Sequence, residues 1–114
     1  MRSPDLLHLT VEPLEDARLI RARGELDMSS AVALRAELDA ARAELVTVVL
    51  DLSDVIFMDS TGLNLLLEAS RSAAVTDWAF FIVRPSTAVR RVIDVSRTAD
   101  LLTLVEPSAE RRVA

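Results

Sequence analysis

The sequence lacks cysteine and lysine, and it has only one histidine and two glycines among 114 residues. Without cysteine the chain can form no disulfide, thiolate metal site or thiol nucleophile. All 13 basic residues are arginine, which excludes a P-loop lysine and a Schiff-base lysine. Two glycines are too few for the G-x-G-x-x-G pattern of a dinucleotide-binding loop. We therefore expect no metal site and no cofactor.

The chain is also poor in basic charge, since its formal net charge is −5 at pH 7. Binding to nucleic acid needs a basic surface, and the arginine pairs at 90–91 and 111–112 are mixed with acidic residues. No apolar run approaches the roughly 18–20 residues that span a membrane. The first five residues lack the apolar stretch of a secretory signal. We expect a cytoplasmic protein that neither binds nucleic acid nor inserts into a membrane.

The length and the 51% hydrophobic content predict one folded domain. We place this domain at residues 6–106, between a flexible N-terminus at 1–5 and a C-terminal tail at 107–114. Apolar periodicity predicts strands at residues 6–11, 18–26, 46–52, 78–83 and 102–105. Helical spacing after capping side chains predicts three helices, which begin near residues 30, 61 and 87. We also expect a last helical turn in the tail.

This alternation of strands and helices predicts an α/β fold. We expect a mixed, mostly parallel sheet of about five strands, covered by three to four helices. In such folds the loops at the carboxyl ends of the strands usually carry the functional site.

Acidic residues occur at these predicted strand ends, but none supports catalysis. Asp27, Asp51, Asp54 and Asp59 resemble the acidic residues of a phosphoacceptor receiver domain, yet that mechanism relies on a lysine. A glycosidase cleft normally needs aromatic platforms, and aromatic residues make up only 4% of the chain. We interpret Asp51 and Asp54 as caps of a strand-end turn. His8 alone cannot complete a nucleophilic serine site, so we expect no enzyme.

The segment at residues 57–63 is a hydroxyl-rich turn that leads into an apolar helix. One interpretation is a plain helix cap. The other is a phosphorylation switch, because the free N–H groups and dipole of a helix N-terminus accommodate a phosphate on Ser60. That phosphate would add negative charge beside Asp59 and would repel a docked partner. The preceding Phe57 and Met58 are apolar, and we expect them to be exposed.

Four segments together make the chain resemble a STAS domain of the anti-sigma factor antagonist family. They are Gly24-Glu25-Leu26-Asp27, the apolar strand at 48–53, Asp59-Ser60-Thr61-Gly62-Leu63, and Pro85-Ser86 with Val89-Arg90-Arg91-Val92. They occur in the order and spacing of the family, and the resemblance covers residues 6–106.

The resemblance implies a partner-switching cycle. The unphosphorylated protein binds an anti-sigma factor that is also a serine kinase, and the sigma factor is released. The kinase then phosphorylates Ser60, and a PP2C-type phosphatase resets the cycle. Gly62 would allow the kinase backbone to approach closely, and we expect a monomer or weak dimer. The expected partner-binding residues are Asp27, Met28, Met58, Asp59, Thr61, Gly62, Leu63 and Asn64.

The chain departs from the family at several positions. Asn64 replaces a frequent glycine, and the turns at 75–77 and 96–98 lack the usual glycines. Thr61 is a second potential acceptor of phosphate. One alternative function stays open, in which the domain is an interaction module of another assembly. That assembly could be a stress-signalling scaffold or a lipid transporter with a cytosolic STAS partner.

Overall fold

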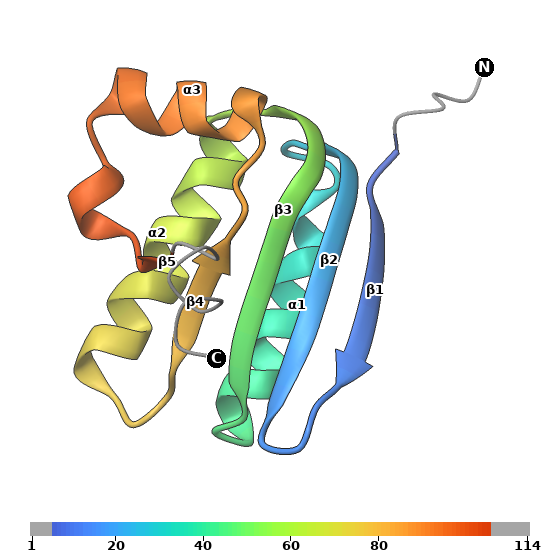
Figure 1. Cartoon of the computed structure of the whole chain (residues 1–114), viewed down its shortest axis with the longest axis vertical. Coiled ribbons are helices and arrows are strands. Elements are labelled where there is room, and N and C mark those ends of the chain that lie inside the picture. The colour runs from blue at the N-terminus through green and yellow to red at the C-terminus, as the bar shows by residue number, and fades with distance from the viewer. Residues whose placement is uncertain (1–5, 106–114) are drawn as a thin grey trace, which may run out of the picture.

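The computed structural model describes residues 6–105, which form one sheet and its covering helices (Figure 1). The elements in chain order are β1 (His8–Pro13), β2 (Ala17–Leu26), α1 (Ala31–Ala43), β3 (Thr47–Met58), α2 (Ser60–Val75), β4 (Phe80–Val83), α3 (Thr87–Ser96), the 3-10 helix η1 (Ala99–Leu101) and β5 (Leu104–Val105). The predicted α/β class and element order are confirmed. The predicted N-terminal segment and the helical turn in the tail lie outside the described residues.

The five strands follow one another across the sheet in the order β1-β2-β3-β4-β5. β1 pairs antiparallel with β2, and all other neighbours are parallel. Right-handed crossovers between sequential parallel strands place the connecting helices on the same side of the sheet. Accordingly α1 and α2 lie behind the sheet in Figure 1, while α3 lies across the end toward which the parallel strands run.

The core lies between the sheet and the helices α1 and α2. Alternate residues of β2 and β3 point into it, as Ile20 and Leu50 illustrate with no exposed surface. The helices contribute buried leucines three or four positions apart, such as Leu34 and Leu38 of α1 and Leu66 of α2. These apolar patterns of period two and period 3.6 are the ones from which the strands and helices were predicted.

The register of β2 against β3 shifts twice along the pair. One shift lies where Arg21 and Arg23 oppose Asp51 and Asp54, and the second follows Gly24. At each shift β3 contains one residue more than β2, which is the pattern of a β-bulge. β3 therefore continues beyond the point where regular alternation stops.

The predicted strand at 46–52 is too short because of these bulges. Buried apolar residues of β3 are two apart up to Leu52 and then three apart, at Val55 and Met58. The predicted strand-end turn at Asp51 and Asp54 is also wrong, because both residues lie within the strand. A simple period-two pattern cannot detect a strand whose inward residues change their spacing.

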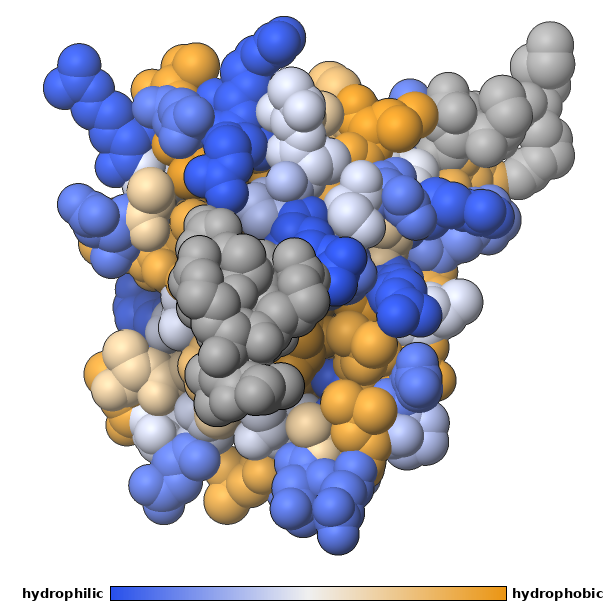
Figure 2. Space-filling model, in the orientation of Figure 1, coloured by the Kyte–Doolittle hydropathy of each residue, from blue (hydrophilic) through white to orange (hydrophobic). Residues whose placement is uncertain are grey.

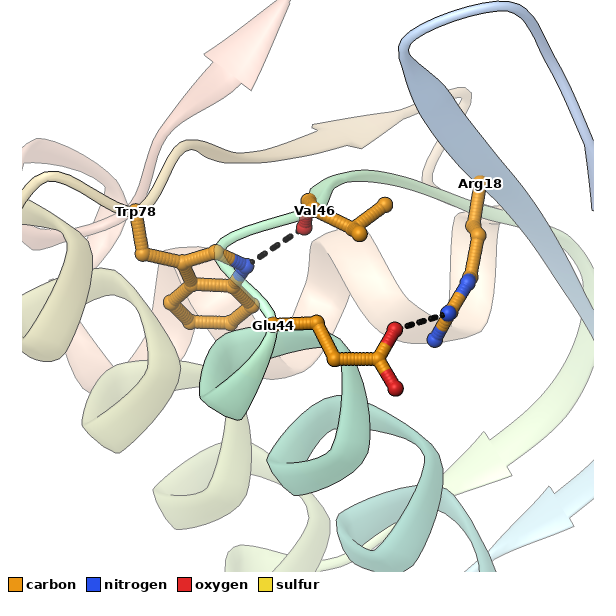
Figure 3. Close-up of polar contacts among 4 residues, drawn as sticks. All are labelled: Arg18, Glu44, Val46 and Trp78. Atoms are coloured by element: carbon orange, nitrogen blue, oxygen red, sulfur yellow. Dashed lines mark hydrogen bonds and ion pairs between the residues drawn. The ribbon is translucent and has the colours of Figure 1, made fainter.

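The amino-terminal end of the parallel strands is closed by two polar contacts (Figure 3). The indole N–H of Trp78 donates to the carbonyl oxygen of Val46 at 2.8 Å. Arg18 of β2 pairs with Glu44 at 2.6 Å. Trp78 is buried and stacks on Phe80, with ring centroids 5.5 Å apart. These contacts hold the connection between α1 and β3 in place at the end opposite to Ser60.

The turn after α3 shows how the chain manages without the expected glycine. Arg97 ends the helix in the left-handed region, with φ 60° and ψ 42°. Its N–H donates to the Asp94 carbonyl, and the Thr98 N–H donates to the Ile93 carbonyl. This closure of a helix is usually made by glycine, because a Cβ atom is unfavourable in the left-handed region.

We expect Arg97→Gly to stabilise the protein by about 0.5–1 kcal/mol. The substitution removes a cost of roughly 1–2 kcal/mol for a left-handed L-residue, offset in part by the greater freedom of glycine in the unfolded chain. Urea denaturation measures the free energy of unfolding. The matched control is Arg91→Gly inside the same helix, which should lose about 1 kcal/mol. Equal losses for both variants would contradict this account of the turn.

Candidate functional site

Two loops meet at the carboxyl ends of β2 and β3. Leu26 and Met58, the last residues of these strands, are partners in the parallel register. The next residues, Asp27 and Asp59, therefore begin neighbouring loops. The Asp59 N–H donates to the Leu26 carbonyl at 3.2 Å, which continues the contact past the end of the sheet. The structure thus brings together the two aspartates that the sequence placed at strand ends.

The Asp59 carboxylate joins the two loops. Its Oδ1 accepts the N–H of Gly62 at 3.0 Å, which is the N-cap bond of α2. Its Oδ2 accepts the N–H of Met28 in the other loop at 3.2 Å. The extended backbone of Asp59, with φ −100° and ψ −173°, is typical of an N-cap. One side chain therefore fixes both the start of α2 and the loop before α1.

Ser60 is the first residue of α2 and is exposed to solvent. Its hydroxyl has no hydrogen-bond partner within residues 6–105. It lies at the helix N-terminus, where the dipole and the unpaired N–H groups favour negative charge. Thr61 follows and is half-buried. Of these two hydroxyl residues, Ser60 is the more accessible to a modifying enzyme.

Asp27 organises the loop between β2 and α1. Its Oδ1 accepts the N–H of Ser30 at 3.0 Å, and the N–H and hydroxyl of Ser29 at 3.1 and 3.0 Å. The Ser30 hydroxyl accepts the Asp27 N–H at 2.9 Å and donates to the Glu25 carbonyl at 2.7 Å. The hydrogen bonds to the carboxylate lower the pKa of Asp27 below its ordinary value of 3.8, and the bond from the Ser30 N–H contributes most. The predicted capping by these side chains is wrong for α1, because its N-cap Ser30 makes no side-chain cap bond and the bonds of Asp27 close the turn before the helix.

Three of the expected partner-binding residues point into the protein. Met58 and Leu63 are buried in the core with 3% and 7% of their surface exposed. A Cβ atom on Gly62 would lie 2.8 Å from both the Leu26 carbonyl oxygen and Cγ of Met58. The predicted exposure of Met58 is therefore wrong. The structure gives Gly62 an internal role, because the protein's own β2 and β3 ends approach it.

Exposed apolar side chains occur in the segments that Asp59 connects. Met28 is 72% exposed, and Phe57 is 47% exposed as predicted. Ile56, which is 56% exposed, escapes prediction from the sequence. It is the additional residue of the second bulge, so Ile56 and Phe57 are both exposed although they are consecutive. We call Met28, Ile56 and Phe57 the apolar rim.

Asn64, the remaining expected site residue, is exposed in the first turn of α2. Within the described part of the chain, no group of three potential metal ligands from histidine, aspartate and glutamate comes together. No helix between residues 6 and 105 has the length and apolar character needed to cross a membrane. The arrangement offers an exposed hydroxyl, acidic groups and apolar side chains.

Comparisons with known proteins agree with the fold. The sequence model of the STAS domain matches residues 8–110. The anti-sigma F factor antagonist of Lysinibacillus sphaericus is 29% identical over 93 residues, which is 79% of this chain and 80% of that protein. An anti-sigma factor antagonist from Mycobacterium paratuberculosis has a TM-score of 0.78 and 29% identity, covering 94% of this chain and 91% of its own. The unphosphorylated form of the anti-sigma factor antagonist SpoIIAA has a TM-score of 0.73 and 25% identity, covering 93% of each chain.

We expect Gly62→Ala to destabilise the protein by about 1–3 kcal/mol, because the added methyl group overpacks the contact with Leu26 and Met58. Urea denaturation measures this loss. Asn64→Ala is the matched control in the same turn, and its exposed side chain should change stability by no more than about 0.5 kcal/mol. If Gly62→Ala were as stable as the parent protein, the close approach would not constrain this position.

The stability conferred by Asp27 should depend on pH. Because the folded state lowers the pKa of Asp27, its stabilising effect is complete above the unfolded value of 3.8. The effect is lost as the pH falls through the folded value. Asp27→Asn should therefore be less stable than the parent protein at pH 7, and the difference should shrink as the pH falls below 3.8. Denaturant melts between pH 2.5 and 7 measure the difference, and a constant difference would contradict the assignment.

Proposed function

Because the chain belongs to the STAS domain family, we propose that it is an anti-sigma factor antagonist and that Ser60 is its phosphoacceptor. In this proposal the chain is a binding protein and not an enzyme. Its unphosphorylated form binds an anti-sigma factor with serine kinase activity in the cytoplasm, and the sigma factor is released. Phosphorylation of Ser60 by that kinase ends the interaction, and a PP2C-type phosphatase restores it.

The observation that carries this proposal is the position of Ser60. Its exposed hydroxyl lies at the first residue of α2, with no hydrogen-bond partner within residues 6–105. Asp59 holds that helix end against the loop of Met28. A kinase can therefore reach the hydroxyl without unfolding the protein, and the surroundings of the hydroxyl are fixed before the kinase binds.

The charges around Ser60 support phosphorylation as a switch. A phosphate adds about −1.5 to −2 charge. The Gly62 N–H is already bonded to the Asp59 carboxylate, so the phosphate would lie beside this carboxylate as a second negative group. Asp27 in the adjoining loop has a lowered pKa and is negative at neutral pH. A partner that tolerates the acidic surface of the unmodified protein would meet a much stronger negative field after modification.

The apolar rim supports a protein partner at the same end of the sheet. Exposed Met28, Ile56 and Phe57 offer side chains that lose contact with water when a partner covers them. Burial of such residues usually supplies most of the affinity of a small interface. The complementary face of the partner should combine apolar residues with basic groups that face Asp27 and Asp59.

The proposal predicts opposite behaviour for two variants of Ser60. Ser60→Ala should bind the anti-sigma kinase as the unmodified protein does and should accept no phosphate. Ser60→Asp, or protein phosphorylated at Ser60, should bind about 100-fold more weakly, which corresponds to about 2.7 kcal/mol. Isothermal titration calorimetry measures both affinities, and mass spectrometry locates the phosphate after incubation with the kinase and ATP.

Thr61→Ala is the control for this experiment, since it removes the second hydroxyl and leaves Ser60 in place. It should still be phosphorylated at Ser60. Labelling that persists in Ser60→Ala but disappears in Thr61→Ala would assign the switch to Thr61. Equal binding of Ser60→Ala and Ser60→Asp would show that charge at this helix end is not the switch.

A further inference from the structure

The sheet has a second face, which α1 and α2 do not cover (Figure 1). The strand register places two rows of side chains on this face. The first row contains Leu19, Val49 and Phe81, and the second contains Arg21, Asp51, Val83 and Val105. Apart from one ion pair, Arg21 Nε to Asp51 Oδ2 at 3.8 Å, the two rows are apolar. Figure 2 views this face and shows hydrophobic surface on it.

This face is hollowed in two places that share Val49 and Val83. One hollow also includes Leu19 and Arg21 of β2, and it reaches Leu14 in the turn before that strand. Its polar lining residues, besides Arg21, are Asp51, Ser53 and Arg84. The other extends to Phe81 and to Val105 of β5. Together they form a groove that is apolar at its β4 and β5 end and carries both apolar and charged residues at its β2 end, and we call it the sheet groove. It crosses β2, β3 and β4 and ends at β5.

We propose that residues 106–114 of the same chain occupy the sheet groove. This segment begins directly after Val105, whose side chain already lines one end of the groove. Its nine residues span up to about 30 Å when extended. The distance from β5 to β2 is three strand spacings, or about 14 Å. The segment is therefore long enough to cross the whole groove.

The chemistry of the segment matches that of the groove. The sequence from residue 106 is Glu-Pro-Ser-Ala-Glu-Arg-Arg-Val-Ala, which combines small residues with two acidic and two basic ones, the latter being Arg111 and Arg112. On the sheet, Oδ1 of Asp51 accepts the N–H of Ser53 at 2.9 Å, while Oδ2 has only the Arg21 contact at 3.8 Å. Oδ2 therefore retains capacity to accept from a second guanidinium. The STAS match also continues to residue 110, beyond the end of β5.

This inference goes beyond the proposed function and does not depend on it. A segment lying in the sheet groove would keep the apolar rows of the sheet away from water and from other proteins. Recognition would then be confined to the end of the sheet that carries Ser60 and the apolar rim.

The absence of native cysteine allows a direct test by disulfide formation in the full-length chain. The test protein carries Val49→Cys in the groove and Ala109→Cys in the segment. The matched control carries Leu101→Cys with Ala109→Cys, because Leu101 is exposed and lies only four residues before Val105. Oxidation at low protein concentration, followed by mass spectrometry, measures the rate at which each intramolecular disulfide forms.

We expect the test pair to form its disulfide at least tenfold faster than the control pair. Arg111→Glu with Arg112→Glu should slow the test pair several-fold. Equal rates for the two pairs would overturn the proposal. A test pair that gives mainly disulfide-linked dimers would assign the groove to a second copy of the chain. Circular dichroism checks the fold, and Phe81→Cys replaces Val49→Cys if that variant does not fold.

Discussion

The parallel pairing of β2 with β3 is the constraint on which the rest of this structure depends. It aligns Leu26 with Met58, so both strands end at the same level. The loops that follow begin side by side, and the carboxylate of Asp59 is close enough to bond to both. Two bulges in β3 make this alignment possible, because they lengthen β3 relative to β2. The position of Ser60 is thus set by the register of a strand pair.

The same pairing explains why Gly62 is needed in the first turn of α2. The turn lies against the Leu26 carbonyl and the Met58 side chain, where a Cβ atom finds no space. Its helical backbone requires no special conformation, so the requirement for glycine is purely steric. The family resemblance pointed to a partner at this position, whereas the structure places the ends of the protein's own strands there. A motif residue can therefore serve the fold inside a functional surface.

Much of the fold follows from the sequence because most of its elements keep their ordinary periodicity. Alternation around Ile20 and helical spacing around Leu34 and Leu38 are sufficient to place β2 and α1. The second half of β3 could not be predicted, since its bulges replace a spacing of two by a spacing of three. For the site, parallel strand ends bring Asp27 and Asp59 together as expected. Which neighbouring side chains point outward depends on the bulges, and no local pattern reveals that.

The double hydrogen bonding of Asp59 also has a consequence for local motion. The amides of Met28 and Gly62 are 34 positions apart in sequence, but both depend on one carboxylate for protection. When that side chain leaves its rotamer, the first turn of α2 and the loop before α1 lose an anchor at the same instant. We therefore expect the two segments to open together more often than either opens with the sheet beneath them. On this expectation, the surface around Ser60 fluctuates as a unit that joins two distant parts of the sequence.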